Sequence, residues 1–153
     1  MTPPRRRRAT PLAVAALSVL LPHAWAQDSK RGFAYIGDPH KNDNNLLTSE
    51  KSPLIWYYNW APSPPSQVPQ DRLEFVPLIH GLSEASSDAT SSQLNRLPDS
   101  STHLLSFNEP DGTRDSGGSN IEPEDAAKSY IEHIVPLREG NRKWKISHPS
   151  TTG

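Results

Sequence analysis

Short apolar runs that are nearly continuous, instead of alternating with polar residues, constrain the fold of this chain most strongly. Strands buried on both faces of a parallel sheet have this character, whereas half-exposed strands alternate apolar and polar residues. We therefore expect five parallel strands. The runs are Gly32 to Ile36, Leu54 to Trp60, Glu74 to Ile79, His103 to Phe107, and Trp144 to Ser147.

The segments between these runs are expected to carry helices. The clearest helical pattern extends from about Pro123 to Leu137. Proline suits the first position of a helix, and Glu124 and Asp125 complement the positive end of the helix dipole. The segment from Asp88 to Leu97 is a weaker helix candidate, and the serine- and glycine-rich tract from Asp111 to Asn120 is expected to be a long loop.

Alternating strands and helices predict an α/β architecture with right-handed crossovers, which place the carboxyl ends of all strands at one rim. Ligands bind at that rim in such folds, so polar residues directly after each run are the first candidates for a site. They are Asp38, Asn59, Trp60, His80, Asn108, Glu109 and His148.

Residues 1–26 have the features of a secretory signal peptide. Four arginines, Arg5 to Arg8, precede the apolar run from Leu12 to Leu21, which is too short to span a bilayer. Ala24-Trp25-Ala26 supplies a small-x-small cleavage pattern, so we expect cleavage before Gln27. The alternative, an Arg-rich transit peptide or membrane-surface helix, lacks an amphipathic period. The mature chain, residues 27–153, is expected to be secreted to the extracellular space or cell wall and to leave the membrane.

Charge and composition exclude several partners. Without residues 1–26, 12 basic residues face 17 acidic ones, and a net acidic surface disfavours nucleic-acid binding. The chain has no cysteine, so packing and not disulfides must stabilise it. The histidines are scattered, without His-x-His or His-Glu-x-x-His spacing, and we expect neither a metal site nor a cofactor.

The tripeptide Asn108-Glu109-Pro110 follows the fourth apolar run directly. Taken alone, such a tripeptide is more often a turn, in which Asn108 and Asp111 shape the chain and Pro110 ends the strand. At a strand end backed by apolar neighbours, however, a carboxylic acid can be desolvated enough to stay protonated near neutral pH and to protonate a glycosidic oxygen. The neighbouring amide of Asn108 can donate to a sugar hydroxyl.

Several ordered motifs, which together span about residues 32–153, resemble those of glycoside hydrolase family 128, the fungal alkali-sensitive-linkage-protein-like glycosyl hydrolases. That resemblance implies a (β/α)8 TIM barrel and endo-acting cleavage of β-1,3-glucan with retention. The motifs are Trp56-Tyr57-Tyr58-Asn59-Trp60, Phe75 to Gly81, Leu105 to Asp111, Pro123 to Ala127, and Ile134 to Leu137 followed by Lys145 to Pro149.

The resemblance assigns roles to single residues. Glu109 is similar to the general acid/base after the fourth strand, and Asn108 to the neighbouring residue that binds the donor sugar. We also expect Asp111 to bind substrate. Asn59 and Trp60 resemble rim residues after the second strand.

Two of the rim positions leave a choice open. Trp60 either stacks on a pyranose face or belongs to the core with its aromatic neighbours. At His80 the family commonly has tryptophan, which implies a weaker or altered sugar subsite.

A retaining glycosidase needs two carboxylates about 5 to 5.5 Å apart. The resemblance places the nucleophile, a glutamate, after the seventh strand, whereas the given sequence ends after its fifth apolar run. A complete barrel takes about 250 residues, so we expect an incomplete barrel of about five β/α units, a catalytic domain truncated at the C-terminus, and no hydrolysis by this chain as written. The alternatives are a non-catalytic, secreted or wall-associated β-glucan-binding protein, or an unstable fragment without function.

Overall fold

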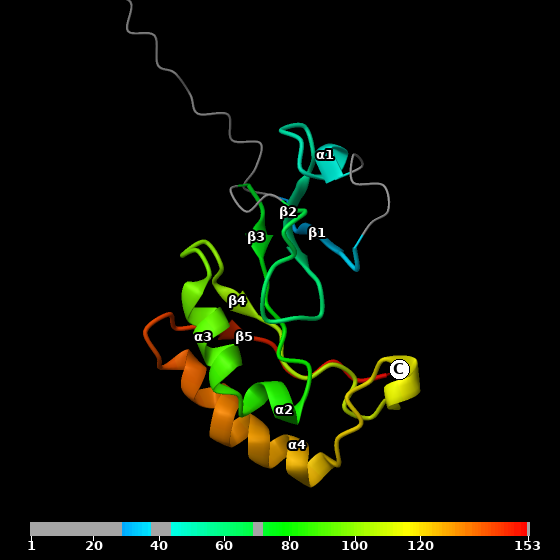
Figure 1. The fold of residues 1–153 in the computed structure, drawn as a ribbon, viewed down its shortest axis with the longest axis vertical. Helices are drawn as coiled ribbons and strands as arrows, with labels where there is room; N and C mark the ends of the chain where they lie inside the picture. Colours follow the sequence, from blue (N-terminus) through cyan, green and yellow to red (C-terminus); the bar gives the residue numbers. More distant parts are fainter. Residues whose placement is uncertain (1–28, 38–43, 69–71, 153) are drawn as a thin grey trace, which may run out of the picture.

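The computed structural model describes residues 29–37, 44–68 and 72–152 (Figure 1). The predicted signal peptide and the rim candidate Asp38 lie outside the described residues.

Five strands form at the five apolar runs, each shorter than the run that predicted it. Two sheets, β1-β2-β3 and β4-β5, contain parallel pairs only. A parallel bridge between Leu78 and Leu105 joins the sheets, so the strands follow one another in sequence order. The strands are β1 (Arg31–Ala34), β2 (Leu54–Tyr58), β3 (Glu74–Phe75), β4 (His103–Leu104) and β5 (Lys145–Ile146).

Helices connect most of the strands. The described residues include α1 (Asn44–Leu47), α2 (Leu82–Ala85), α3 (Asp88–Arg96), the 3-10 helix η2 (Arg114–Ser116) and α4 (Pro123–Ser129). α3 confirms the weaker helix prediction. Ser87 caps its N-terminal end, where the Ser87 hydroxyl accepts a hydrogen bond from the Thr90 amide. Between β2 and β3 the described residues form turns and no helix, in a segment where prolines remove backbone donors.

The predicted helix from Pro123 to Leu137 is present, but it changes type along its length. α4 continues as the π-helix η3 (Tyr130–Ile134) and then as the 3-10 helix η4 (Val135–Arg138). Pro136 has no backbone N–H, and its ring crowds the carbonyl four residues earlier, so a regular α-helix cannot pass through this position. The sequence pattern located the helix and missed its change of pitch.

One face of the sheet carries the hydrophobic core. Tyr57 and Phe75, which are paired across β2 and β3, are fully buried together with Leu104 and Phe107. They pack with apolar residues of the helix layer, including Leu94 of α3 and Ile134 of η3. In Figure 1, α2, α3 and α4 lie together beside β4 and β5.

The opposite face of the sheet is only partly covered. Trp56 and Glu74 are paired on this face, and both are half-buried, while His103 at the start of β4 is exposed. The Trp56 ring lies directly over Gly32, where an added Cβ would come within 2.2 Å of ring carbons. The prediction of burial on both faces therefore holds only in part for this face. Val76 and Leu78 of the third run are buried, whereas Trp56 and Glu74 are half-buried, because the described strands form an open sheet with β1 and β5 at its edges.

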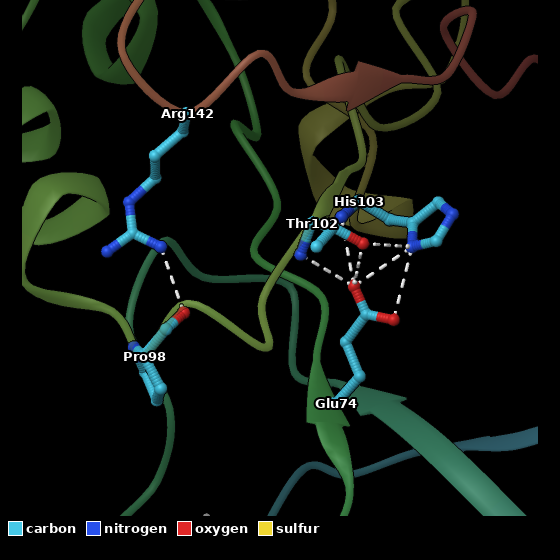
Figure 2. A network of polar contacts seen from close by, with 5 residues as sticks. All are labelled: Glu74, Pro98, Thr102, His103 and Arg142. Atoms are coloured by element: carbon cyan, nitrogen blue, oxygen red, sulfur yellow. Dashed lines mark hydrogen bonds and ion pairs between the residues drawn. The ribbon is translucent and has the colours of Figure 1, made fainter.

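A polar network joins the amino-terminal ends of β3 and β4 (Figure 2). One carboxylate oxygen of Glu74 accepts hydrogen bonds from the amides of Thr102 (2.7 Å) and His103 (2.9 Å), and it lies 2.9 Å from His103 Nδ1. Partial burial raises the pKa of Glu74, but the hydrogen bonds from Thr102 and His103 outweigh that effect and leave the pKa below its ordinary value.

Arg142 closes the end of α3 near this network. Its guanidinium donates to the carbonyls of Pro98 (2.9 Å) and Asn95 (3.3 Å) and also contacts the carbonyl of Leu97. The same group lies 5.5 Å from the centre of the Trp144 ring. A cation at the C-terminal end of a helix satisfies carbonyls that lack partners within the helix.

Candidate active site

Main-chain hydrogen bonds bring the carboxyl-terminal ends of the strands together, as the alternation of strands and helices predicted. Beyond β4, the Asn108 amide donates to the His80 carbonyl (3.1 Å) and the Glu109 amide donates to the Ser150 carbonyl (2.7 Å). A parallel bridge between Asn108 and Ser150 continues the pairing of β4 with β5. His80, Asn108 and Glu109 therefore lie on adjacent segments at one rim.

The Glu109 backbone is held in an unusual conformation at this rim. Its φ of 43° lies in the left-handed region, which side chains other than glycine adopt at a cost of about 1 to 2 kcal/mol. Its carbonyl accepts hydrogen bonds from the amides of Gly112 (2.9 Å) and Ser119 (3.1 Å). The half-buried side chain, by contrast, has no hydrogen-bond or ion-pair partner among the described residues. Strained residues of this kind concentrate at functional sites.

Asn108 and His80 hold the same atom of the loop that follows β4. Asn108 Nδ2 donates to the Gly117 carbonyl at 3.1 Å, and His80 Nε2 lies 3.2 Å from that oxygen. A carbonyl only accepts, so the His80 ring donates through Nε2 in this arrangement. The loop is tightly folded, since a Cβ at Gly118 would lie 2.5 Å from the carbonyl of Gly112. Both predicted sugar-binding side chains thus also position this loop.

The carboxylate of Asp111 fastens the segment after β5 to the loop after β4. It accepts from the Thr152 amide (3.0 Å to Oδ1) and from the Thr152 hydroxyl (2.6 Å to Oδ2). These hydrogen bonds, first from the Thr152 side chain and then from its backbone, lower the pKa of Asp111. The predicted substrate role of Asp111 stays a prediction, and in this arrangement its carboxylate is engaged within the chain.

The two rim residues after β2 lie in a turn. The Asn59 side chain donates to the Ser63 carbonyl (3.0 Å) and accepts from the Ala61 amide (3.2 Å), so it shapes this turn. Trp60 has a left-handed φ of 56°, and its half-buried ring lies 4.7 Å from the ring of Tyr58 at an angle of 56°. Trp60 is not part of the buried core, which leaves part of its surface open to a ligand.

A pocket of about 560 Å³ adjoins the rim beside His80. Its walls include Glu84 of α2 and Arg114 of η2. Sequence reasoning missed both residues, because they lie on a helix and in a loop instead of directly after a strand. The serine- and glycine-rich composition of the loop after Asp111 was the only available signal.

Other kinds of site receive no support from the described residues. No group of three histidine, aspartate or glutamate side chains in the described ranges could hold a metal ion. Among the helices described, none is long and apolar enough to span a bilayer.

Parallel strands with a carboxylic acid at the carboxyl-terminal end of one of them are typical of TIM-barrel hydrolases. The profile of the family described as glycosyl hydrolase catalytic core matches residues 32–153, and the chain belongs to this family. No curated protein sequence matches the chain.

Solved structures of glycoside hydrolase family 128 resemble this chain. An endo-β-1,3-glucanase mutant from Amycolatopsis mediterranei, in complex with laminarihexaose, is 20% identical and matches 82% of this chain and 45% of its own, with a TM-score of 0.61. A curdlan-specific exo-β-1,3-glucanase from Blastomyces gilchristii, in complex with glucose, is 29% identical over 77% of this chain and 45% of its own, with a TM-score of 0.57. An oligosaccharide-binding protein from Trichoderma gamsii is 18% identical over 84% of this chain and 47% of its own, with a TM-score of 0.54.

These matches confirm the resemblance to family 128 that the sequence motifs indicated. They also indicate a TIM-barrel-like fold, of which the described residues form an open part. The chain spans slightly less than half the length of each of these solved relatives.

Proposed function

We propose that this chain is a glycoside hydrolase-type module that recognises β-1,3-glucan at the carboxyl-terminal ends of its strands, with Glu109 in the position of the general acid/base. One observation carries the proposal: the Glu109 backbone is fixed by three hydrogen bonds, to the loop after β4 and to the segment after β5, while its carboxylate has no partner among the described residues. A group that protonates a glycosidic oxygen must be held firmly and must also be free to reach the ligand.

Asn108 and Trp60 provide contacts for the sugar in this proposal. The Asn108 amide holds Gly117 through one N–H, which leaves its second N–H and its oxygen for sugar hydroxyls. The open part of the Trp60 ring offers a flat apolar surface for the C–H face of a pyranose. His80 provides a smaller surface than tryptophan does, which supports an altered subsite beside β3.

The proposal extends to activity and location. Retention requires a second carboxylate about 5 to 5.5 Å from Glu109, and the carboxylate of Asp111, two residues away, is engaged by Thr152. We therefore propose that this polypeptide, an open barrel of about five β/α units, binds glucan without hydrolysing it. The features of residues 1–26 support secretion to the extracellular space or cell wall.

Calorimetric titration of the full chain with laminarihexaose tests the binding site. We expect binding that weakens about tenfold in Asn108→Ala, since a hydrogen-bonding side chain at the rim is lost. Glu109→Gln is the matched control, because it keeps the shape of the side chain and removes only the proton donor. Absence of binding by the unmodified chain, or unchanged binding in Asn108→Ala, would contradict the proposed site. Release of reducing sugar by the chain alone would contradict its proposed inactivity.

A non-catalytic β-glucan-binding protein, in which Glu109 has no acid/base role, is the second candidate, and the oligosaccharide-binding relative from T. gamsii favours it. Azide separates the two candidates, because it supplies a small external nucleophile. It attacks the anomeric carbon, the glycosidic bond breaks, and a functional Glu109 gives its proton to the departing oxygen. Glycosyl azide formed from laminarihexaose, and lost in Glu109→Gln, indicates a catalytic site; binding without this product indicates the second candidate.

A further inference from the structure

We infer that the pocket beside His80, called here the side pocket, binds a single glucosyl branch that projects from a β-1,3-glucan main chain. This inference rests on the proposed function and adds a substrate class to it. The side pocket has a volume of about 560 Å³, within the range of small-molecule sites.

The side pocket lies beside the rim, in the layer of helices. Its walls come from α2, from η2, and from the segment that leads into α4. Only His80 and Gly81 come from the segment directly after β3, and Glu109 is not part of the lining. A glucan main chain that crosses the strand ends at Asn108 and Glu109 passes next to this pocket, because His80 and Gly117 belong both to the pocket wall and to the hydrogen-bonded junction with Asn108.

The wall chemistry suits an uncharged ligand rich in hydroxyl groups. Glu84 brings one negative charge and Arg114 one positive charge, so the pair favours no net charge on the ligand. Glu84 accepts hydrogen bonds and Arg114 donates them, whereas a sugar hydroxyl does both. Ser119 adds a buried hydroxyl that has no hydrogen-bond partner among the described residues. Leu82, 37% exposed, adds apolar surface for the C–H groups of a sugar ring.

The position of the pocket favours a branch linked through O6. In a β-1,3-linked chain, O1 and O3 of each unit are used by the main chain, and O2 and O4 sit on ring carbons next to the linkage at C3, while O6 lies on a rotating methylene outside the ring. A glucosyl group on O6 can therefore leave the rim sideways and enter the helix layer. The ligand class is a β-1,3-glucan that carries single β-1,6-linked glucosyl branches.

Paired titrations test the inference. The full chain is titrated with linear laminarihexaose and with a β-1,3-gluco-oligosaccharide of equal main-chain length that carries one β-1,6-linked glucosyl branch. We expect the branched ligand to bind about tenfold more tightly, an advantage equivalent to about one hydrogen bond to a charged group. Arg114→Ala and Glu84→Gln should each remove most of that advantage and leave linear binding unchanged. Arg96→Ala and Glu132→Gln, exposed positions outside the pocket, are the matched controls and should retain it.

The outcomes separate this inference from the function on which it rests. If the two ligands bind equally, or if the advantage of the branched ligand persists in Arg114→Ala and Glu84→Gln, branch binding in the side pocket is overturned. Glucan binding at the rim is then still supported. If linear glucan does not bind, titration with gentiobiose, the β-1,6-linked disaccharide, tests the side pocket by itself. Chemical shift changes confined to Gly117 and its pocket neighbours would then support the pocket without the glucan site, and no response to any of the three sugars would overturn both.

Discussion

Two glutamates at opposite ends of the strands show how position decides what a carboxylate does. Glu74 begins β3, and its side chain accepts hydrogen bonds from the backbone and side chain of Thr102 and from His103. Glu109 follows β4, and its backbone is fixed while its side chain has no partner among the described residues. The first carboxylate joins two strands, and the second is free for a ligand. In α/β barrels, stability and chemistry are divided between the two rims in this way.

Among the variants that test this comparison, removal of the Glu74 carboxylate is expected to lower the free energy of unfolding most. Glu74→Ala leaves the amides of Thr102 and His103 without their acceptor, and we expect the free energy of unfolding to fall by about 2 to 3 kcal/mol. Urea denaturation followed by circular dichroism measures the change. Glu109→Ala is the matched control at the other rim and should change stability by less than about 0.5 kcal/mol. Equal losses in the two variants would remove the distinction between the rims.

Arg142 offers a second test at the rim that contains Glu74. Arg142→Ala removes the donors to the Asn95 and Pro98 carbonyls and the contact with Trp144, and we expect a loss of about 1 to 2 kcal/mol. Arg142→Lys keeps the charge but not the forked geometry and should recover about half of the loss. The same urea denaturation measures both variants. If Arg142→Ala lowers the free energy of unfolding no more than the exposed control Arg96→Ala does, the stabilising role of the Arg142 contacts is contradicted.

The pH dependence of stability should also separate the two ends. The folded-state pKa of Glu74 lies below its ordinary value of 4.5, so the unfolded chain binds the proton more readily. Its contribution is present above the unfolded pKa and is lost as the pH falls through the folded pKa. Denaturation curves between about pH 6 and 3 should therefore show a fall in stability that is smaller in Glu74→Gln. An identical pH profile for both proteins would contradict the assigned cause.

Strand positions and the functional rim could be predicted from the sequence, whereas the contacts of the two rims could not. Apolar runs located all five strands, because burial against the helix layer demands continuous apolar side chains. The tripeptide at Asn108 located the rim, because strand ends carry polar residues where the chain turns. Contacts between distant segments could not be read in this way. The residues around Glu74 do not indicate that it binds Thr102, and the residues around Asp111 do not indicate that it binds Thr152. Both hydrogen bonds depend on strand register and loop closure.

Substitution of Asp111 is expected to have the smallest effect on stability. It tests whether a carboxylate at the functional rim holds one local segment in place. Its carboxylate holds Thr152 on the exposed surface, so Asp111→Ala should leave the free energy of unfolding nearly unchanged. Amide exchange at Thr152 should become several times faster, since local opening loses its restraint. Exchange at His103 serves as the internal control. If exchange at Thr152 stays the same, the segment after β5 is held only by the backbone pairing of Ser150 with Phe107 and Glu109. If exchange becomes faster, Asp111 positions that segment beside the carboxylate proposed to meet the glucan.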